Sequence, residues 1–328
     1  MVNSVEIARR LGVSQPTVSL VLNGRWQQHR ICKATRDRVL RAARELNYRP
    51  NRLARGLASR KTNTIGLIIQ TVDHPVQSAL NERLIHLIEA RKFEALITVV
   101  PDFSDTREME ELYHSHYPEG MIVGPLYSAQ PNAFLRQLSR QHFPLVGFEG
   151  DFPVPFDQVT QDRPATLRKA FDHLAEQGHR KIGYIQAQPD ERHEKLVAEI
   201  AGERFGGIYV YWGKFENGYR FANNLPSGPD VPTAYVFQDN CFAAGFVRGA
   251  FKCGIRIPDD VAFVVCGYCE MGDYLTTSLT TVYADLNELA EKVVDLTLAR
   301  IRGEAPPEPQ HVIVESRLVV RESSAKQP

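Results

Sequence analysis

A short stretch near the start of the chain carries hydrogen-bonding side chains at a spacing that would bring them onto one face. It runs from Asn3 to Asn23 and reads NSVEIARRLGVSQPTVSLVLN. If its second half is a helix, the outward face has no acid and consists of Gln15, Pro16, Thr17, Ser19, Leu20 and Asn23. Such a face suits the major groove of DNA, which admits an α-helix and presents donors, acceptors and methyl groups on the base edges.

Two short helices joined by a tight turn would hold this face in place. Asn3 can cap the first helix, with Glu6 as the acidic member of a capping box, and Gly12 falls where a left-handed residue would end it. Ser14 begins the second helix, and Pro16 falls in its first turn, where a missing N–H costs no hydrogen bond. The inward side chains are Ile7, Ala8, Leu11, Val18, Val21 and Leu22. The pattern predicts a helix-turn-helix, and an ordinary helical hairpin in a larger core is the alternative.

A third helix and a short linker follow the hairpin. The third helix is predicted over Ala34–Leu46, and its buried stripe consists of Val39, Leu40, Ala43 and Leu46. Its arginines face either solvent or DNA phosphates, and both readings stay open for Arg36, Arg38, Arg41 and Arg44. Residues 47–61 can form one further helix, with Leu53 and Leu57 on the same face. Because so short a helix is marginal in water, we expect this hinge to fold only when something binds it.

Charge is divided unevenly along the 328 residues. The whole chain has 39 Lys and Arg against 39 Asp and Glu. Residues 1–61 hold 14 of the basic side chains and three of the acidic ones, so this part carries +11 and the remainder −11. A basic head on an acidic body predicts that the head alone binds a polyanion. No apolar run is long enough to span a bilayer, so we expect a cytoplasmic protein.

From residue 64 onward, short apolar runs alternate with helical stretches. We expect strands at 65–70, 95–100, 120–124 and 144–148, with helices at 76–91, 106–114 and 132–141. The alternation resumes with strands at 181–186, 207–212, 233–238 and 261–266, and with helices at 165–177, 218–224 and 242–253. This order is typical of parallel sheets, so the predicted fold class is α/β behind an all-α head. Two doubly wound domains would form a ligand cleft at the carboxyl ends of their strands.

Six motifs occur in a fixed order along the chain: GVSQPTVSLVLN, TRDRVLRAARELNYRPNRLARGLAS, IGLII, GHRKIGYI, GIRIPDDVAFVV and SLTTV. Together they resemble the LacI/GalR family of bacterial transcription regulators. The resemblance implies a DNA-binding head at 1–46, a hinge helix at 47–61 and an effector-binding core at 62–328 that is like a periplasmic sugar-binding protein. It places 62–160 and 285–310 in a first lobe, and 161–284 and 311–322 in a second. The chain lacks the leucine repeat that makes a tetramer of the lactose repressor, so a homodimer is expected.

The same resemblance assigns DNA contacts to the head and the hinge. Base-edge positions fall on Gln15, Pro16 and Leu20, and phosphate positions fall on Thr17, Ser19 and Asn23. Gln15 is the polar reader of the first group, because Pro16 and Leu20 offer only apolar contact. Leu57 falls on the leucine that family hinges wedge between base pairs, which bends the duplex. The remaining candidate DNA contacts are Ser14, Asn51, Arg52 and Arg55.

The effector site is where this chain departs from the family pattern. Asp239-Asn240 inverts the usual Asn-Asp pair, and the aspartate expected after VAFVV is missing, which argues against a typical pyranose site. Arg192 is expected on a loop, near the position where several family members have an arginine that contacts the effector. Trp212 or Phe215 is either an aromatic platform on which a sugar or ring ligand stacks or part of the core. The candidate effector contacts are Asp73, Gln77, Asp162, Arg192, Trp212, Phe215, Asp239, Asn240 and Tyr268. An acidic patch at the lobe crossing is expected from Glu149, Asp151, Asp157 and Asp162.

The five cysteines do not resemble a disulfide framework, since their number is odd and their spacing wide. Cys266 and Cys269 have the CxxC spacing of metal or redox sites, but a structural zinc would need two more ligands. Cys241 and Cys253 could join them only if the fold brings them near. We therefore favour ordinary strand-end residues and predict no metal and no cofactor, with a thiol or metal sensor as the alternative.

These observations predict a homodimeric transcription repressor that binds a pseudo-palindromic operator in double-stranded DNA and responds to a small metabolite such as a sugar. No catalytic residues are predicted, because the core has no glycine-rich phosphate loop, no GxSxG elbow and no metal triad. One alternative is a regulator with an eroded effector site that acts constitutively or through a protein partner. A sugar-processing enzyme is the other alternative.

Overall fold

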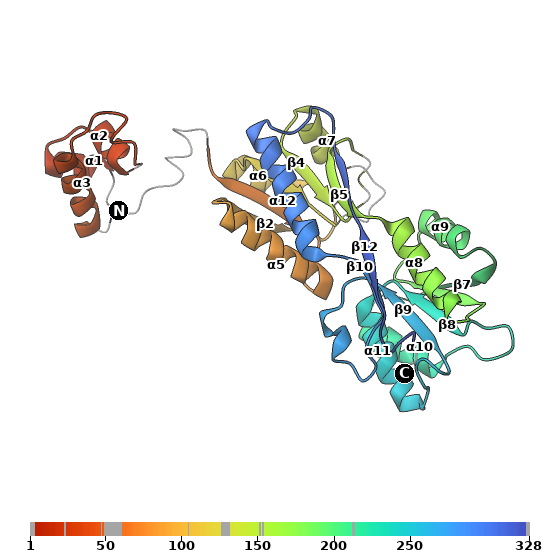
Figure 1. Cartoon of the computed structure of the whole chain (residues 1–328). Helices are drawn as coiled ribbons and strands as arrows, with labels where there is room; N and C mark the ends of the chain where they lie inside the picture. Colours follow the sequence, from red (N-terminus) through yellow and green to blue (C-terminus); the bar gives the residue numbers. More distant parts are fainter. Residues whose placement is uncertain are drawn as a thin grey trace. The chain divides into compact units, whose positions relative to one another are not determined.

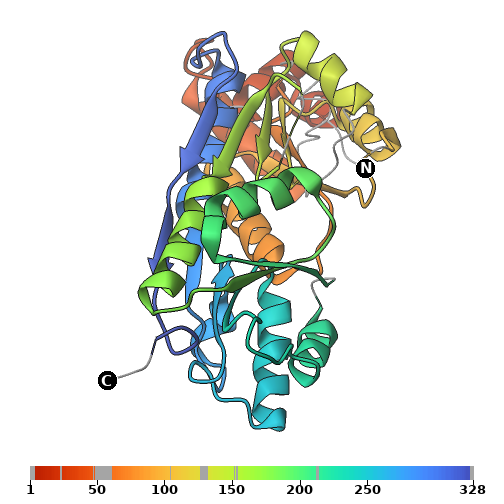
Figure 2. The same cartoon turned by 90° about the vertical axis from the view of Figure 1, so that its right-hand side faces the viewer.

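The chain folds into two compact units, Met1–Asn63 and Thr64–Pro328. The computed structural model describes all residues except 1–3, 23, 47, 49–60, 104, 126–131, 151, 153, 212–213 and 326–328. Figures 1 and 2 show the two units in two views. Because most of 47–61 lies outside the described residues, the hinge helix stays a prediction.

The described residues of the first unit form three helices, and we call this three-helix part the head: α1 (Ser4–Leu11), α2 (Gln15–Leu22) and α3 (Lys33–Glu45). Seven side chains are buried between them, namely Ile7, Ala8, Val18, Val21, Val39, Ala42 and Ala43. Gly12 turns the chain between α1 and α2 with φ at +64°, a left-handed conformation that glycine adopts without strain. The predicted helix-turn-helix is confirmed, although Asn3, its expected cap, lies outside the described residues.

A six-stranded parallel sheet forms the first part of the second unit, which we call the N-lobe. Its strands, in spatial order, are β11 (His311–Val314), β5 (Asp157–Gln161), β4 (Leu145–Phe148), β3 (Gly120–Val123), β1 (Thr64–Ile69) and β2 (Glu94–Val99). Helices α5 (Pro75–Ala90) and α12 (Leu286–Arg302) share one apolar core with the sheet. Helices α6 (Arg107–His116) and α7 (Ala133–Arg140) share another, so both faces are covered (Figure 1).

The second sheet forms the C-lobe. Its strands, in spatial order, are β12 (Ser316–Val319), β10 (Thr281–Ala284), β9 (Ala262–Cys266), β8 (Ala234–Phe237), β6 (Ile182–Gln186) and β7 (Phe205–Val210). Only β12 is antiparallel to its neighbour within this sheet. Helices α8 (Arg163–Glu176) and α9 (Glu191–Ala201) share one core with it, whereas α10 (Phe215–Asn223) and α11 (Asn240–Cys253) share an aromatic-rich one. Two short 3₁₀ helices complete the C-lobe, η1 (Gly202–Arg204) and η2 (Glu270–Asp273).

The chain passes between the two lobes at three points: from β5 to α8, from β10 to α12, and from β11 to β12. The last crossing corrects one expectation. Residues 311–322 were assigned to the second lobe as a whole, but His311–Val314 pairs with Gln158–Gln161 in the N-lobe. Only the part after Glu315 reaches the C-lobe sheet. Two short strands, β11 and β12, follow each other with only Glu315 between them, and each is an edge strand of a different sheet.

Helix α9 also differs from expectation, because Arg192 was expected on a loop. Asp190 caps this helix by accepting hydrogen bonds from the backbone N–H groups of Arg192 and His193. Arg192 is therefore held at the exposed start of a helix. Within the described part of the chain, no helix is long and apolar enough to cross a membrane.

Candidate functional site

The outward face of α2 is accessible to solvent. Its six described residues are exposed or partly exposed: Ser14, Gln15, Pro16, Thr17, Ser19 and Leu20. Ser14 Oγ accepts a hydrogen bond from the Thr17 backbone N–H at 3.3 Å, so Ser14 caps the helix. Gln15 Nε2 donates to Ser4 Oγ at 3.2 Å, which holds the amide beside the start of α1. This face offers hydrogen-bonding side chains on a capped helix. Asn23, the last residue expected on this face, lies outside the described residues.

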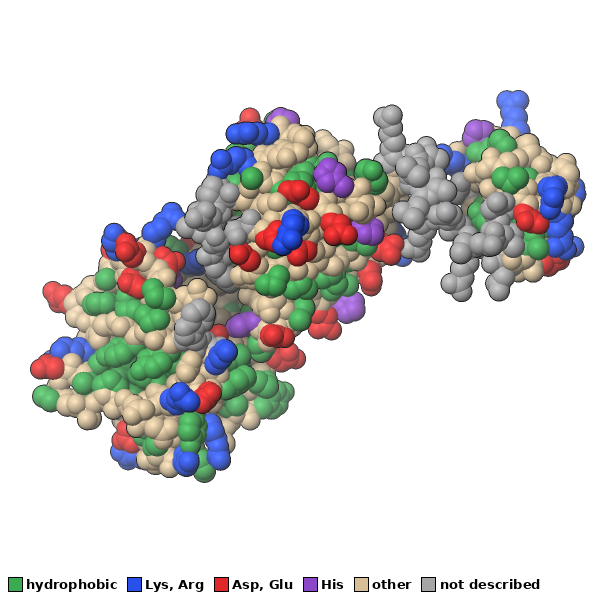
Figure 3. All heavy atoms as spheres, turned by 180° about the vertical axis from the view of Figure 1, so that it is seen from behind, with side chains coloured by type: hydrophobic (Ala, Val, Ile, Leu, Met, Phe, Trp, Pro, Cys, Tyr) green, Lys and Arg blue, Asp and Glu red, His purple; other side chains and the backbone are tan. Residues whose placement is uncertain are grey.

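The arginines of α3 have two kinds of environment. Arg36 lies over the Trp26 ring, 4.8 Å from its centroid, and Arg38 donates to the Leu11 carbonyl at 2.9 Å. These two side chains therefore pack the head together. Arg41 and Arg44 are exposed. Figure 3 shows Lys and Arg side chains gathered along one side of the head.

The hinge candidates cannot be placed in the same way, since Asn51, Arg52, Arg55 and Leu57 all lie outside the described residues. Their assignment to DNA contacts stays a prediction.

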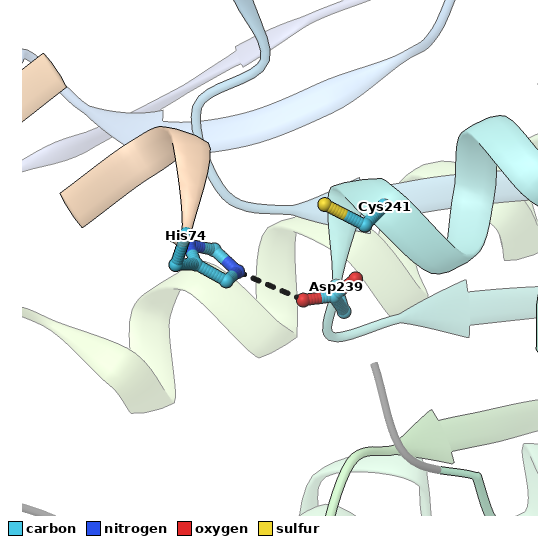
Figure 4. Close-up of side chains that lie close together, drawn as sticks. All are labelled: His74, Asp239 and Cys241. Carbon is cyan, nitrogen blue, oxygen red and sulfur yellow. Dashed lines mark hydrogen bonds and ion pairs between the residues drawn. The ribbon is translucent and has the colours of Figure 1, made fainter. Parts of the chain in front are cut away.

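A hydrogen bond joins the two lobes at the starts of α5 and α11 (Figure 4). His74 directly precedes α5, and Asp239 directly precedes α11. His74 Nε2 lies 3.0 Å from Asp239 Oδ2, while Asp239 Oδ1 accepts from the Phe242 backbone N–H at 2.8 Å. One carboxylate therefore caps α11 and contacts the N-lobe at the same time. Cys241 lies beside this pair on the first turn of α11.

Further polar groups surround this contact between the lobes, which we call the interlobe site. Asn240 Nδ2 donates to the Tyr268 carbonyl at 3.1 Å, and the Arg83 guanidinium of α5 lies 5.8 Å from the Tyr268 ring centroid. Gln77 Oε1 and Asn240 Oδ1 are buried with no hydrogen-bond partner among the described residues. The structure thus brings Asp239, Asn240 and Tyr268 of the C-lobe together with the start of α5.

The structure also gives the surroundings of four other effector candidates. Asp73 is exposed in the turn before α5, and Phe215 begins α10 with half of its surface exposed. Asp162 caps α8, since its carboxylate accepts from the Ala165 backbone N–H at 2.9 Å. Arg192 is exposed on α9, and Trp212 lies outside the described residues.

The expected acidic patch is wrong for two of its members. Asp157 is 2% exposed and forms an ion pair with Arg300 of α12, with Oδ1 2.8 Å from Nη2. Glu149 accepts from the Gln161 backbone N–H at 2.7 Å, and burial raises the pKa of its carboxyl. Both carboxylates therefore have partners within the protein: Asp157 is buried against α12, and Glu149 binds Gln161 of β5. Asp151 lies outside the described residues.

All five cysteines are free thiols. Burial raises the pKa of Cys266 to about 12, and burial raises that of Cys269 as well, so neither has the character of a reactive thiolate. Cys253 is exposed and its thiol donates to Asn223 Oδ1 at 3.1 Å. Only Cys241 joins other potential ligands among the described residues, in a group with His74 and Asp239.

Comparison with known proteins identifies the family. The model for bacterial regulatory proteins of the lacI family matches residues 5–51, and the model for periplasmic binding protein-like domains matches residues 171–324. The HTH-type transcriptional repressor PurR of Shigella sonnei (strain Ss046) is 30% identical over 98% of this chain and 97% of its own. This chain belongs to the lacI family.

The chain is also similar to a second regulator in sequence and to a solved structure in fold. The NTD biosynthesis operon regulator NtdR of Bacillus subtilis (strain 168) is 27% identical over 97% of this chain and 98% of its own. The Lac repressor dimer bound to operator and the anti-inducer ONPF is 20% identical, covers 99% of both chains and has a TM-score of 0.86, which shows the same fold. As a member of the lacI family, the chain is a DNA-binding transcription regulator and not an enzyme.

Sequence reasoning on this lacI-family chain missed His74. The available signal was weak: a histidine directly before Pro75, at the point where a strand and turn lead into a helix. Its importance comes from Asp239, which lies far away in the sequence and in the other lobe. No periodicity or spacing connects the two residues.

Proposed function

We propose that this chain is a homodimeric repressor that binds a pseudo-palindromic operator and changes its operator affinity when a small polar metabolite binds between its lobes. The observation that carries the proposal is the outward face of α2, which is acid-free, solvent-accessible and mounted on a packed three-helix core. A helix of this kind fits the major groove. Because operators lie on the chromosome, we place the protein in the cytoplasm.

Base reading falls to Gln15, with apolar contact from Pro16 and Leu20. Thr17, Ser19 and Asn23 contact phosphates, as Arg52 and Arg55 of the hinge do. In the free head, Gln15 donates to Ser4, and this exposed bond is weak enough to exchange for a base edge. Base contacts select sequence, whereas phosphate contacts set register and affinity.

We divide the chain into a head at 1–46, a hinge at 47–61 and a core at 62–328. Two heads reach two half-sites when the chain is a dimer. The hinge folds only against DNA and against the hinge of the second subunit. It therefore couples the core to the operator, because any movement of the N-lobes changes the free energy of hinge folding.

The interlobe site is where we place the effector. Gln77 Oε1 and Asn240 Oδ1 are buried acceptors without a partner in the described structure, and a ligand hydroxyl or N–H would satisfy them. One observation favours the alternative of an eroded effector site: His74 already occupies Asp239 Oδ2, the oxygen that a sugar hydroxyl would use. A thermal melt of the full chain against a metabolite panel separates the two, since only a working site raises the melting temperature.

The test of DNA binding is selection from randomised duplexes with the full chain. The expected result is a repeated half-site arranged as a pseudo-palindrome, with each mismatch lowering the binding free energy by about 1–3 kcal/mol. Scrambled duplexes of the same composition are the control. Selected sequences that share no half-site would overturn the proposal.

A further inference from the structure

The interlobe site holds three different donor types close together. His74 supplies an imidazole nitrogen, Asp239 a carboxylate oxygen and Cys241 a sulfur, and the three ligand atoms lie within 4.8 Å of one another. Figure 4 shows that the ring of His74 points at Asp239 and that the Cys241 sulfur lies on the same side of α11. Among the described residues, these three form the one group of histidine, cysteine and acidic side chains with such spacing.

The donor set matches zinc better than the hard cations. Zinc binds cysteine sulfur, histidine nitrogen and carboxylate oxygen, whereas magnesium and calcium prefer oxygen alone. Ligand atoms that share a tetrahedral zinc lie roughly 3.3–3.8 Å apart, given metal–ligand distances of about 2.0–2.3 Å. His74 Nε2 and Asp239 Oδ2 are 3.0 Å apart, just below this range, and no pair of the three ligand atoms is more than 4.8 Å apart, so side-chain rotations can bring all three onto one ion.

Asp239 is already oriented for such a role. Its Oδ1 is held by the Phe242 backbone N–H at 2.8 Å, and its Oδ2 faces His74. A ligand whose second oxygen is fixed by a hydrogen bond loses little freedom when it binds a metal, which is the usual arrangement around protein metal ions. His74 and Asp239 have side chains that are 31% and 13% exposed, so an ion can enter from solvent on the histidine side.

Charge also balances at this position. A divalent ion with one carboxylate and one thiolate makes a neutral group, and the start of α11 favours both anions. Burial, with smaller contributions from Asp239 and Cys269, raises the pKa of the Cys241 thiol to about 12, so without a metal the sulfur keeps its proton. Metal binding breaks the S–H bond, forms the metal–sulfur bond and releases one proton to solvent.

We propose that His74, Asp239 and Cys241 bind one zinc-type divalent ion, which links the N-lobe to the C-lobe. Three protein ligands leave the fourth position of a tetrahedral ion for water or for a donor atom of a small molecule. The ion would thereby fasten the two lobes in the arrangement of this structure. The inference is independent of the operator proposal, because the binding concerns the core alone and is measured without DNA.

The experiment uses the reduced, chelator-treated full chain and two probes, zinc and cobalt(II). Zinc affinity and stoichiometry come from competition with a chromogenic chelator, and cobalt reports a thiolate ligand through its sulfur-to-metal charge-transfer band. The test variants are Cys241→Ser and His74→Gln. The matched controls are Cys253→Ser, an exposed cysteine at the other end of α11, and His86→Gln, an exposed histidine on α5.

We expect the wild-type chain and both controls to bind one zinc per chain and to show the cobalt–thiolate band. Cys241→Ser should lose the band, and each test variant should bind zinc at least about 10-fold more weakly, since loss of even an indirect metal contact has effects of that size. Asp239→Asn guards against misfolding, because its amide oxygen can still cap α11 while the carboxylate ligand is gone. It should weaken zinc binding as well.

Two results would overturn the proposal. One is a wild-type chain that binds no stoichiometric zinc, in which case the His74–Asp239 contact is only a hydrogen bond. The other is zinc binding that survives in Cys241→Ser but is lost in Cys266→Ser, which would move the ion to the CxxC pair.

Discussion

The polar side chains at the start of α2 and those at the start of α11 have the same local chemistry and opposite surroundings. In each case a side-chain oxygen caps the helix, Ser14 for α2 and Asp239 for α11. The residues beside Ser14 face solvent, whereas Asp239 meets His74 from the other lobe. A capped helix start therefore serves as an open recognition surface in the head and as an internal link in the core. The group that faces the helix start determines which of these two roles it has, and the helix propensity of the sequence does not.

The largest expected effect tests the open surface. Affinity for a cognate operator should fall about 10³- to 10⁵-fold between roughly 50 and 200 mM salt, because several phosphate contacts release counterions. The reason is the +11 charge of residues 1–61. Gel shifts at rising salt measure it. A flat response would show that the head does not bind DNA through its basic side chains, so the start of α2 would not be an open recognition surface.

The next effect tests what holds α11 in place. Helices α10 and α11 approach so closely that a Cβ added at Gly245 would lie 1.8 Å from the Phe215 carbonyl oxygen. We expect Gly245→Ala to push the helices apart and to lower the free energy of unfolding by about 1–3 kcal/mol, as overpacking does. Denaturant titration of the full chain measures this loss.

Gly272→Ala is the matched control for that substitution, because its nearest neighbours would lie at 3.5 Å, an ordinary contact distance. The control should change stability little. Equal losses in both variants would indicate that α10 and α11 adjust to the extra methyl group, and that the position of Asp239 does not depend on this close approach.

A change of base preference tests α2 directly. Gln15→Ala should reduce discrimination at one base pair of each half-site by about 1–3 kcal/mol, because a base-edge hydrogen bond is lost. Arg44→Ala, at an exposed position of α3, should instead weaken binding to all sequences about equally. Selection from randomised duplexes compares the two. If the Gln15 variant selects the wild-type sequence, another residue reads that base.

The two helix starts also differ in how much of them the sequence reveals. The outward face of α2 was predictable because Val18 and Val21 set its register locally, and both are buried as expected. At α11, the sequence singled out Asp239 and Asn240 as departures from the family pattern but offered no reason for them. In the structure, Asp239 contacts His74 of the other lobe, and a contact between lobes is a property of the folded chain.

The same limit explains the expectations that were wrong. Asp157 was expected in an acidic patch at the lobe crossing, because no residue near it in the sequence indicates that it pairs with Arg300. Residues 311–314 were assigned to the wrong lobe, because the sheet that a strand joins depends on which sheet edge is free to pair with it in the folded chain. Alternating apolar runs predicted both sheets, but side-chain roles at the lobe crossing required the packed structure.

The smallest expected effect compares the two caps themselves. Ser14→Ala should destabilise α2 by about 1 kcal/mol, the usual cost of losing an N-cap. Asp239→Ala should cost about the same for its cap and about 1 kcal/mol more for the hydrogen bond to His74. Amide hydrogen exchange of α2 and α11 in the full chain measures each local loss, since it reports the free energy of local opening.

A double-mutant cycle isolates the extra part. In a His74→Ala background, Asp239→Ala should cost only the cap, so the two substitutions should be non-additive by about 1 kcal/mol. If Asp239→Ala costs the same with and without His74, the hydrogen bond between the lobes contributes nothing to stability. The start of α11 would then be an ordinary cap, like that of α2, and the contrast between the two helix starts would disappear.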